Sequence, residues 1–147
     1  MKNFDEIKLA KELIRFPTIM TEDRGIMKFL SKKLYSMGFK CKIIKSKGLG
    51  SKPALNLFAK FGNSRPHINF LGHTDVVLNL NNWSVSPFKA AVKNGYVYGR
   101  GAQDMKGGIA CWMGAVSKFI NNKNFKGSIS VIIAADEETT GYGTPAV

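Results

Sequence analysis

Acidic residues are scarce over most of this chain, although lysines are spread along all of it. Of its ten carboxylates, five lie within the first 23 positions. The others are Asp75, Asp104, Asp136, Glu137 and Glu138, in the segments LGHTDVV, GRGAQDMKGG and IIAADEETT. Solvated surface acids would be scattered as the lysines are. Acids confined to places beside a histidine, a glycine-rich turn and a strand end indicate ligands for a divalent metal.

Cysteines and long apolar runs are also few. Cys41 and Cys111 have no CxxC spacing, so a reduced, cytoplasmic compartment is the simplest expectation. No apolar stretch approaches the roughly 18 to 20 residues that a membrane span needs. The N-terminal segment MKNFDEIKLAKELIRF carries acids where a signal peptide has an apolar region. We therefore expect a cytoplasmic protein without membrane contact.

The net charge of +12 would suit a nucleic-acid partner, but the kinds of basic residue argue against one. Only four of the 22 basic residues are arginine, which is the preferred residue for bidentate contacts with bases and phosphates. No run of Lys and Arg is longer than two. A lysine-rich solvated surface explains the charge, so we expect only nonspecific binding to polyanions at low salt.

The apolar pattern predicts the secondary structure of a single α/β domain. Helices are predicted over residues 4–16, from a Thr21 cap to the stop at Gly38, and over 105–120. Strands are predicted over 39–44, 55–61, 67–71 and 128–134, with a hairpin between 88–92 and 96–98. The nearly all-apolar run 67–71 is typical of a strand buried on both faces. This order predicts a mixed sheet flanked by helices.

Polar side chains follow two of the predicted strands. His73 and Asp75 come after the strand 67–71, and the acidic triplet comes after the strand that ends at 134. Ligands gather at the carboxyl ends of strands in open α/β sheets. Because residues i and i+2 share a side of an extended segment, Asp75 can accept the second ring N–H of His73. The other histidine, His67, is predicted to be structural.

Asp104 and the acidic triplet each have an alternative explanation. Asp104 is either the N-cap of the helix over 105–120 or a carboxylate that bridges two ions roughly 3.5 to 4 Å apart. Adjacent Asp136, Glu137 and Glu138 are either an acidic surface loop or a group whose repulsion a dication relieves. In the second case one glutamate binds the metal and its neighbour is free as a general base. The segment GRGAQD lacks the third glycine of a dinucleotide fingerprint.

The segments GHTDVV, WSVSPF (residues 83–88), YVYGRGAQDMKGG and DEE occur in an order and spacing that resemble the catalytic domain of the M20 metallopeptidase family. The motif DMKGG, and the segment NLFAKFG before GHTD, are most similar to the corresponding segments of its succinyl-diaminopimelate desuccinylase branch. The resemblance implies a zinc-peptidase-like fold and hydrolysis of N-succinyl-LL-2,6-diaminopimelate to succinate and diaminopimelate, for lysine biosynthesis. A related deacylase or carboxypeptidase of the family, acting on another N-acyl amino acid, and a non-catalytic remnant are the alternatives.

The resemblance also implies a role for each site residue. His73 would bind one zinc ion, Glu138 would bind a second, and Asp104 would bridge the two. Asp75 would orient His73, and Glu137 would be the general base. The implied cofactor is two Zn²⁺ per complete site, with Co²⁺ as a substitute.

Two departures from the family pattern affect these expectations. Thr139 and Thr140 stand where family members usually have glycine. Family enzymes are also much longer, with a later Glu ligand, a later His ligand and an inserted domain that forms a homodimer. The resemblance therefore implies that residues 1–147 are the N-terminal part of one M20-type catalytic domain. Such a polypeptide is expected to be inactive alone.

Overall fold

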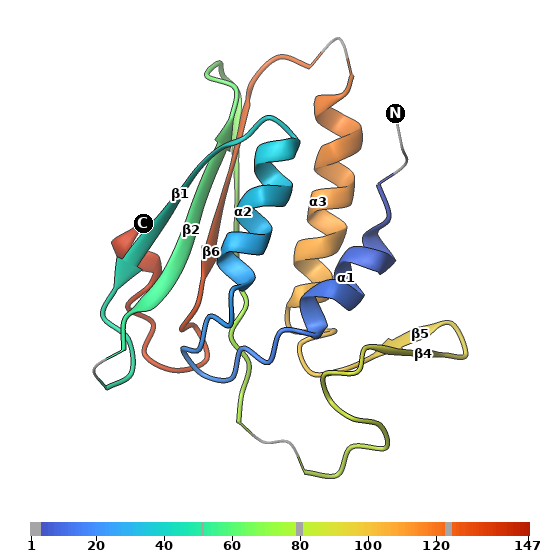
Figure 1. Ribbon diagram of the computed structural model, residues 1–147. Coiled ribbons are helices and arrows are strands. Elements are labelled where there is room, and N and C mark those ends of the chain that lie inside the picture. The colour runs from blue at the N-terminus through green and yellow to red at the C-terminus, as the bar shows by residue number, and fades with distance from the viewer. Residues whose placement is uncertain (1–3, 51, 79–80, 123–124) are drawn as a thin grey trace.

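The computed structural model describes residues 4–50, 52–78, 81–122 and 125–147. Figure 1 shows its helices and strands. The helices are α1 (Glu6–Ile14), α2 (Ile26–Ser36) and α3 (Lys106–Ile120), with a 3₁₀ turn η1 (Thr144–Ala146). The strands are β1 (Lys40–Ser46), β2 (Ala54–Phe61), β3 (His67–His73), β4 (Ala91–Lys93), β5 (Tyr96–Tyr98) and β6 (Ser128–Ala134). None of the helices among these residues is long and apolar enough to cross a membrane.

Four strands form one mixed sheet in the order β1-β2-β6-β3. Strand β2 is antiparallel to β1 and to β6, whereas β3 runs parallel to β6. The helices α1, α2 and α3 lie on one side of this sheet (Figure 1). Strands β4 and β5 form a separate hairpin whose turn, Asn94-Gly95, has positive φ at both residues, as a two-residue turn of type I′ requires. The α/β class and the mixed sheet are confirmed.

The core lies between the sheet and the helices. Leu57 of β2 and Ile133 of β6 are paired neighbours, and both are almost fully buried. From the helices, Leu30 and Met113 enter the same cluster of buried side chains. Burial of each such side chain contributes roughly 1.5 to 3 kcal/mol. Apolar side chains of α2 and α3 therefore pack these helices against the sheet.

Strand β3 differs from its predicted environment. It pairs only with β6 among the described strands, and Ile68 and Leu71 are 59% and 50% exposed. The expectation of a strand buried on both faces is wrong, because an apolar run does not determine where a strand lies in its sheet. The strand also continues past Gly72, so that His73 is its last residue. The site histidine therefore belongs to the sheet itself.

Helix α2 begins later than the sequence predicts. Its N-cap is Gly25, with φ +88°, and Thr21 caps nothing. The N–H of Met20 donates to the carbonyl of Val76, and the N–H of Glu22 donates to the carbonyl of Ile19, so Thr21 lies in a turn beside the residues after β3. The carboxylate of Asp23 then accepts hydrogen bonds from the N–H groups of Gly25 and Met27. A long-range backbone contact thus overrides the local capping preference of Thr21.

Candidate metal centre

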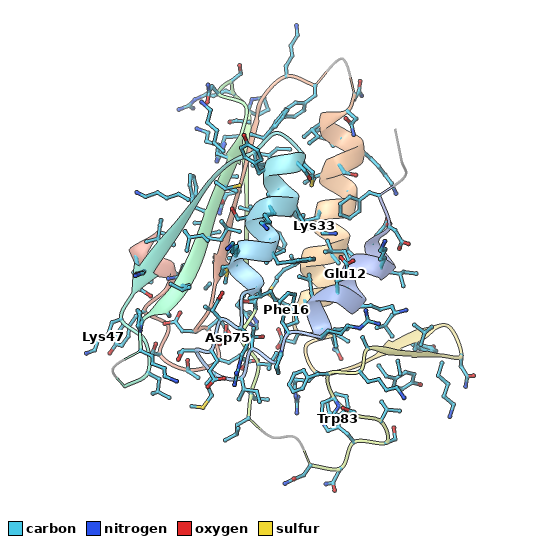
Figure 2. The ribbon with its side chains drawn as sticks, in the orientation of Figure 1. Glu12, Phe16, Lys33, Lys47, Asp75 and Trp83 are labelled. Atoms are coloured by element: carbon cyan, nitrogen blue, oxygen red, sulfur yellow. The ribbon has the colours of Figure 1, made fainter. Side chains whose placement is uncertain are left out.

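Three separate segments meet where β3 and β6 end. His73 pairs with Ala134, and each is the last residue of its strand. Because the two strands are parallel, the residues that follow them leave the sheet at the same edge. Asp75 lies at the lower end of the sheet in Figure 2, and it is 1% exposed. Asp104 reaches the same place from the turn before α3.

The donor atoms of His73, Asp104 and Glu138 lie within 4.8 Å of one another. The His73 Nε2 atom is 3.1 Å from Asp104 Oδ1 and 3.6 Å from Glu137 Oε2. The imidazole is almost fully buried, whereas the Asp104 side chain is 72% exposed. The buried imidazole of His73 therefore faces the exposed carboxylates of Asp104 and Glu137, whose side chains are free to change rotamer.

Asp75 contacts two of the three segments. The His73 Nδ1 atom is 3.2 Å from the backbone carbonyl oxygen of Asp75 and 3.5 Å from its Oδ1. The other carboxylate oxygen, Oδ2, accepts a 2.7 Å hydrogen bond from the N–H of Glu138. The predicted proximity of Asp75 to His73 is thus present, while its bond to Glu138 was not foreseen. This arrangement turns Nε2 toward the carboxylates.

Asp104 is not the N-cap of α3 in the structure, and its metal-binding role stays a prediction. The N-cap of α3 is Met105, and no side chain caps the helix there. The preceding turn depends on Gly101, which has φ +80° and whose carbonyl accepts the N–H of Lys106. A Cβ at Gly101 would lie 3.0 Å from a methylene carbon of Lys106. This turn leaves the Asp104 carboxylate directed at His73.

The charges at the centre suit a cation. Burial raises the pKa of Glu138, and the negative charge of Asp104 raises it further. Burial lowers the pKa of His73, but its contacts with Asp75 and Asp104 outweigh burial and bring the value to about 9. In the metal-free protein at neutral pH, the imidazolium therefore offsets the charges of the acids. One imidazole and two carboxylates are donors that zinc accepts, so these residues fit a divalent metal.

A hollow of about 580 Å³ adjoins the cluster and is lined by Asp104 and Glu138. Trp83, from the segment WSVSPF, forms part of its wall, and the Arg100 guanidinium lies 5.1 Å from the Trp83 ring centroid. The backbone N–H of Arg100 donates to the carbonyl of Pro87. The volume is in the range of small-molecule sites.

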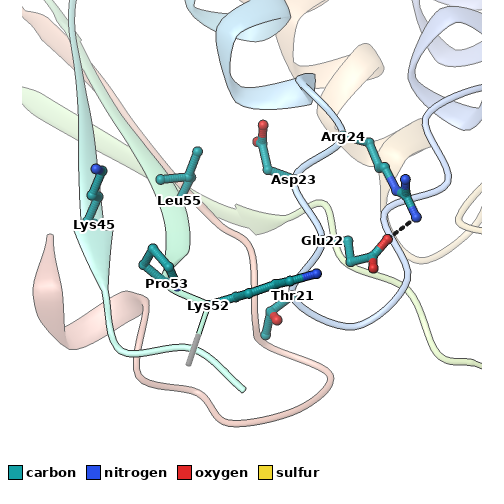
Figure 3. Close-up of a pocket in the computed structure, with 8 residues that line it drawn as sticks. All are labelled: Thr21, Glu22, Asp23, Arg24, Lys45, Lys52, Pro53 and Leu55. Atoms are coloured by element: carbon teal, nitrogen blue, oxygen red, sulfur yellow. Dashed lines mark ion pairs between the residues drawn. The ribbon is translucent and has the colours of Figure 1, made fainter. Parts of the chain in front are cut away.

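A second hollow, of about 460 Å³, lies between the loop before α2 and the strands β1 and β2 (Figure 3). Its described lining contains no histidine. Glu22 forms an ion pair with Arg24, and Asp23 accepts the two N–H groups that begin α2. Its acids are therefore engaged in local structure, and it is not the candidate metal centre.

Lys106 is a residue whose role the sequence did not reveal. It is fully buried, and its Nζ donates a 2.7 Å hydrogen bond to the carbonyl of Phe16. Burial lowers its pKa to about 8, against the opposing effect of the Asp75 charge. In a chain with lysines throughout, no local signal separates this one from the surface. It connects the end of α1 to the start of α3, next to Asp104.

Replacement of Lys106 by alanine is expected to lower the free energy of unfolding by about 2 to 4 kcal/mol, since it leaves a cavity and removes a buried hydrogen bond to the Phe16 carbonyl. Lys106→Met, which keeps the volume, should cost about half as much. The control is Lys118→Ala on the same helix, at an exposed ion pair with Glu6, with an effect below about 1 kcal/mol. Urea unfolding measures all three. Equal losses for Lys106→Ala and Lys118→Ala would contradict the burial argument.

The mixed α/β fold and the cluster of one imidazole and two carboxylates define a candidate metal-binding domain. The pattern of Peptidase family M20/M25/M40 matches residues 70–147, over half of the chain, and the chain belongs to this family. Family membership implies a divalent metal at the cluster.

Named relatives agree with this assignment. The chain is 50% identical over 141 residues to succinyl-diaminopimelate desuccinylase of Pelagibacter ubique, covering 94% of this chain and 37% of that protein. It is 42% identical over 147 residues to the enzyme of the same name from Ehrlichia canis, covering 97% of this chain and 38% of that protein. The chain therefore spans little more than a third of the length of these relatives.

Solved structures share the fold. Human carnosine dipeptidase 1 superposes with a TM-score of 0.81 at 22% identity, over 94% of this chain and 33% of that one. An M20 family metallo-carboxypeptidase from Sulfolobus solfataricus superposes with a TM-score of 0.80 at 21% identity, over 91% of this chain and 31% of that one. At these identities the likeness concerns the fold alone.

Proposed function

We propose that this chain provides metal-binding and proton-transfer residues for the hydrolysis of N-succinyl-LL-2,6-diaminopimelate to succinate and LL-2,6-diaminopimelate. One observation carries the proposal: the donor atoms of His73, Asp104 and Glu138 converge within 4.8 Å, with Glu137 beside them. The relatives named as desuccinylases support the choice of substrate. The setting would be diaminopimelate and lysine biosynthesis in the cytoplasm.

In this proposal the metal is zinc, with two ions in a complete site. His73 would hold one ion, Glu138 the other, and Asp104 both. Bound zinc supplies a Lewis acid that polarises the carbonyl group of the scissile amide. The 147 residues would correspond to the N-terminal part of an M20 catalytic domain.

Glu137 is the proposed general base. Its side chain is 58% exposed, and its Oε2 lies 3.6 Å from the same His73 nitrogen that faces Asp104. Glu137 would accept a proton from the attacking water as the water oxygen bonds to the amide carbon. When the C–N bond breaks, Glu137 would return that proton to the departing amine. Asp75 would keep His73 oriented throughout.

A chimeric enzyme tests this function. Residues 1–147 would replace the matching segment of the Pelagibacter ubique relative, which is 50% identical over 141 residues. We expect the chimera to release succinate from N-succinyl-diaminopimelate in the presence of zinc. Glu137→Gln in the chimera should lower kcat by about 10²- to 10⁴-fold and leave zinc content unchanged, because the amide cannot accept the proton.

The control reactions separate the alternatives. The 147-residue chain alone is expected to bind zinc weakly and to hydrolyse nothing. It would offer each ion two protein ligands, whereas catalytic zinc normally has three. A folded, zinc-loaded chimera that cleaves N-acetylornithine but not the succinyl substrate would favour a related deacylase. A zinc-loaded chimera that cleaves neither would favour a non-catalytic role for this chain.

A further inference from the structure

We infer that Asp136 and Thr140 are positioning residues, which close the loop formed by residues 136–143 and so hold Glu137 and Glu138 ready for the metal. This inference rests on the proposed metal centre. It assigns a task to Asp136, the one carboxylate of the acidic triplet that is not directed at His73 in the described structure. It also gives the Thr140 hydroxyl a function.

The Asp136 carboxylate bonds to the far end of its own loop. The side chain is fully buried. Both of its oxygens accept the N–H of Gly143, at 2.9 and 3.0 Å, and Oδ2 also accepts the Thr140 hydroxyl at 2.7 Å. Its backbone carbonyl accepts the N–H of Gly141 at 2.8 Å. The residue immediately before the two glutamates is thus tied to positions four, five and seven residues further along.

The start of the loop is anchored to the sheet. The N–H of Ala135 donates to Oδ1 of Asn56 on β2, and Asn56 is fully buried. The Asn56 amide donates in turn to Ser46 Oγ on β1, at 2.9 Å. Because Asn56 fixes Ala135, it fixes the origin of the Asp136 side chain. Asp136 then transfers that order to the remainder of the loop.

Gly143 permits the closure. A Cβ at this position would overlap the carboxylate of Asp136 and the amide oxygen of Asn56. The approach of its backbone N–H to Asp136 therefore requires glycine, although its φ of −68° is ordinary. Glycine is needed because the oxygen atoms of Asp136 and Asn56 occupy the space that a side chain at position 143 would fill.

These bonds act on the glutamates and not on the hydrophobic core. Of residues 135–143, only Ala135 belongs to the core cluster. The N–H of Glu138 bonds to Asp75, so the loop is held at its start, at Glu138 and at Thr140. A loop ordered before the metal arrives has less conformational entropy to lose on binding. Removal of a bond that orients ligands typically costs about 10- to 100-fold in metal affinity.

Thr140→Val tests the inference, because it removes the hydroxyl and keeps the shape. We expect the purified 147-residue chain carrying it to bind Co²⁺ about tenfold more weakly. Its visible cobalt spectrum should also change, as Glu138 becomes less ordered. Thr140→Ser should restore the affinity and the spectrum. Asp136→Asn, which keeps one acceptor oxygen, should weaken binding in the same direction.

Thr139→Val is the matched control. Among the described residues, the Thr139 hydroxyl donates to the Asp136 backbone carbonyl, at 3.3 Å, and to no oxygen of the Asp136 carboxylate. Its removal should leave Co²⁺ affinity within about threefold, as for most surface changes. The thermal midpoint of each metal-free variant reports any general loss of stability.

The outcomes distinguish this inference from the proposed function. If Thr140→Val binds Co²⁺ as the unaltered chain does while Asp104→Ala fails to bind, the positioning role is wrong and the metal centre stands. Equal losses in Thr139→Val and Thr140→Val, or no restoration by Thr140→Ser, would also overturn the positioning role. If the unaltered chain itself binds no Co²⁺, the metal centre and this inference both fail.

Discussion

Asp104→Ala is expected to lower the zinc affinity of the 147-residue chain by more than about 100-fold. Loss of a residue that only orients a ligand costs about 10- to 100-fold, and loss of a ligand should exceed that range. Asp104 Oδ1 lies 3.1 Å from His73 Nε2, and the carboxylate caps no helix. Its removal should therefore affect metal binding and leave α3 intact. Isothermal titration with zinc gives the affinity directly.

Gln103→Ala is the control for Asp104→Ala. Gln103 is exposed in the same turn and lines the same hollow, but it offers no carboxylate. We expect its zinc affinity to match that of the unaltered chain. The circular dichroism spectrum should be the same for both variants. Equal zinc binding by Asp104→Ala and by the unaltered chain would refute the assignment of Asp104 as a ligand.

Zinc affinity should rise about tenfold for each pH unit between pH 6 and 8 and level off near pH 9, because binding displaces one proton from His73. The contacts of His73 with Asp75 and Asp104 outweigh burial and raise its pKa from 6.5 to about 9 in the metal-free protein. Below pH 9 the ion therefore competes with a proton for Nε2. Titrations in two buffers of different ionisation enthalpy measure the number of protons released.

The stability of the metal-free chain should change in the opposite direction over the same window. A raised histidine pKa means that the folded protein holds a proton which the unfolded protein has lost. The stabilisation from His73 is complete below pH 6.5 and disappears as the pH rises through about 9. His67→Gln is the control, since His67 bonds to Ser128 and Ser130 away from the cluster. A free energy of unfolding of the metal-free chain that does not fall between pH 6.5 and 8.5 would contradict this prediction, and a zinc affinity that does not vary over that range would contradict the preceding one.

The sequence predicted the helices and strands well wherever the signal was local. The strand from Ser128 to Ala134 has the predicted bounds, and Gly38, with φ +92°, ends the second helix as expected. The start of that helix was missed because a backbone bond between Met20 and Val76 fixes the turn that contains Thr21. That bond joins residues far apart in the chain, and no capping rule contains it.

The solvent exposure of β3 could not be predicted from the sequence for a similar reason. The composition of residues 67–71 describes their polarity, whereas exposure depends on what lies on each side of the strand. Only β6 pairs with β3 among the described strands, which leaves Ile68 and Leu71 open to solvent.

The sequence by itself determined the chemistry that is available at the site. The confinement of late carboxylates to three segments identified His73, Asp75, Asp104 and the triplet 136–138 as candidates, because donor type and local spacing are properties of short segments. The family resemblance then chose Glu137 and Glu138 from the triplet. Only the tertiary structure decided how these groups meet. The pairing of His73 with Ala134 brings two strand ends together, Lys106 is buried against Phe16, and Asp136 bonds to Gly143 and Thr140. The physical reason is that these contacts depend on the register and packing of distant elements, which the pattern of any one segment does not specify.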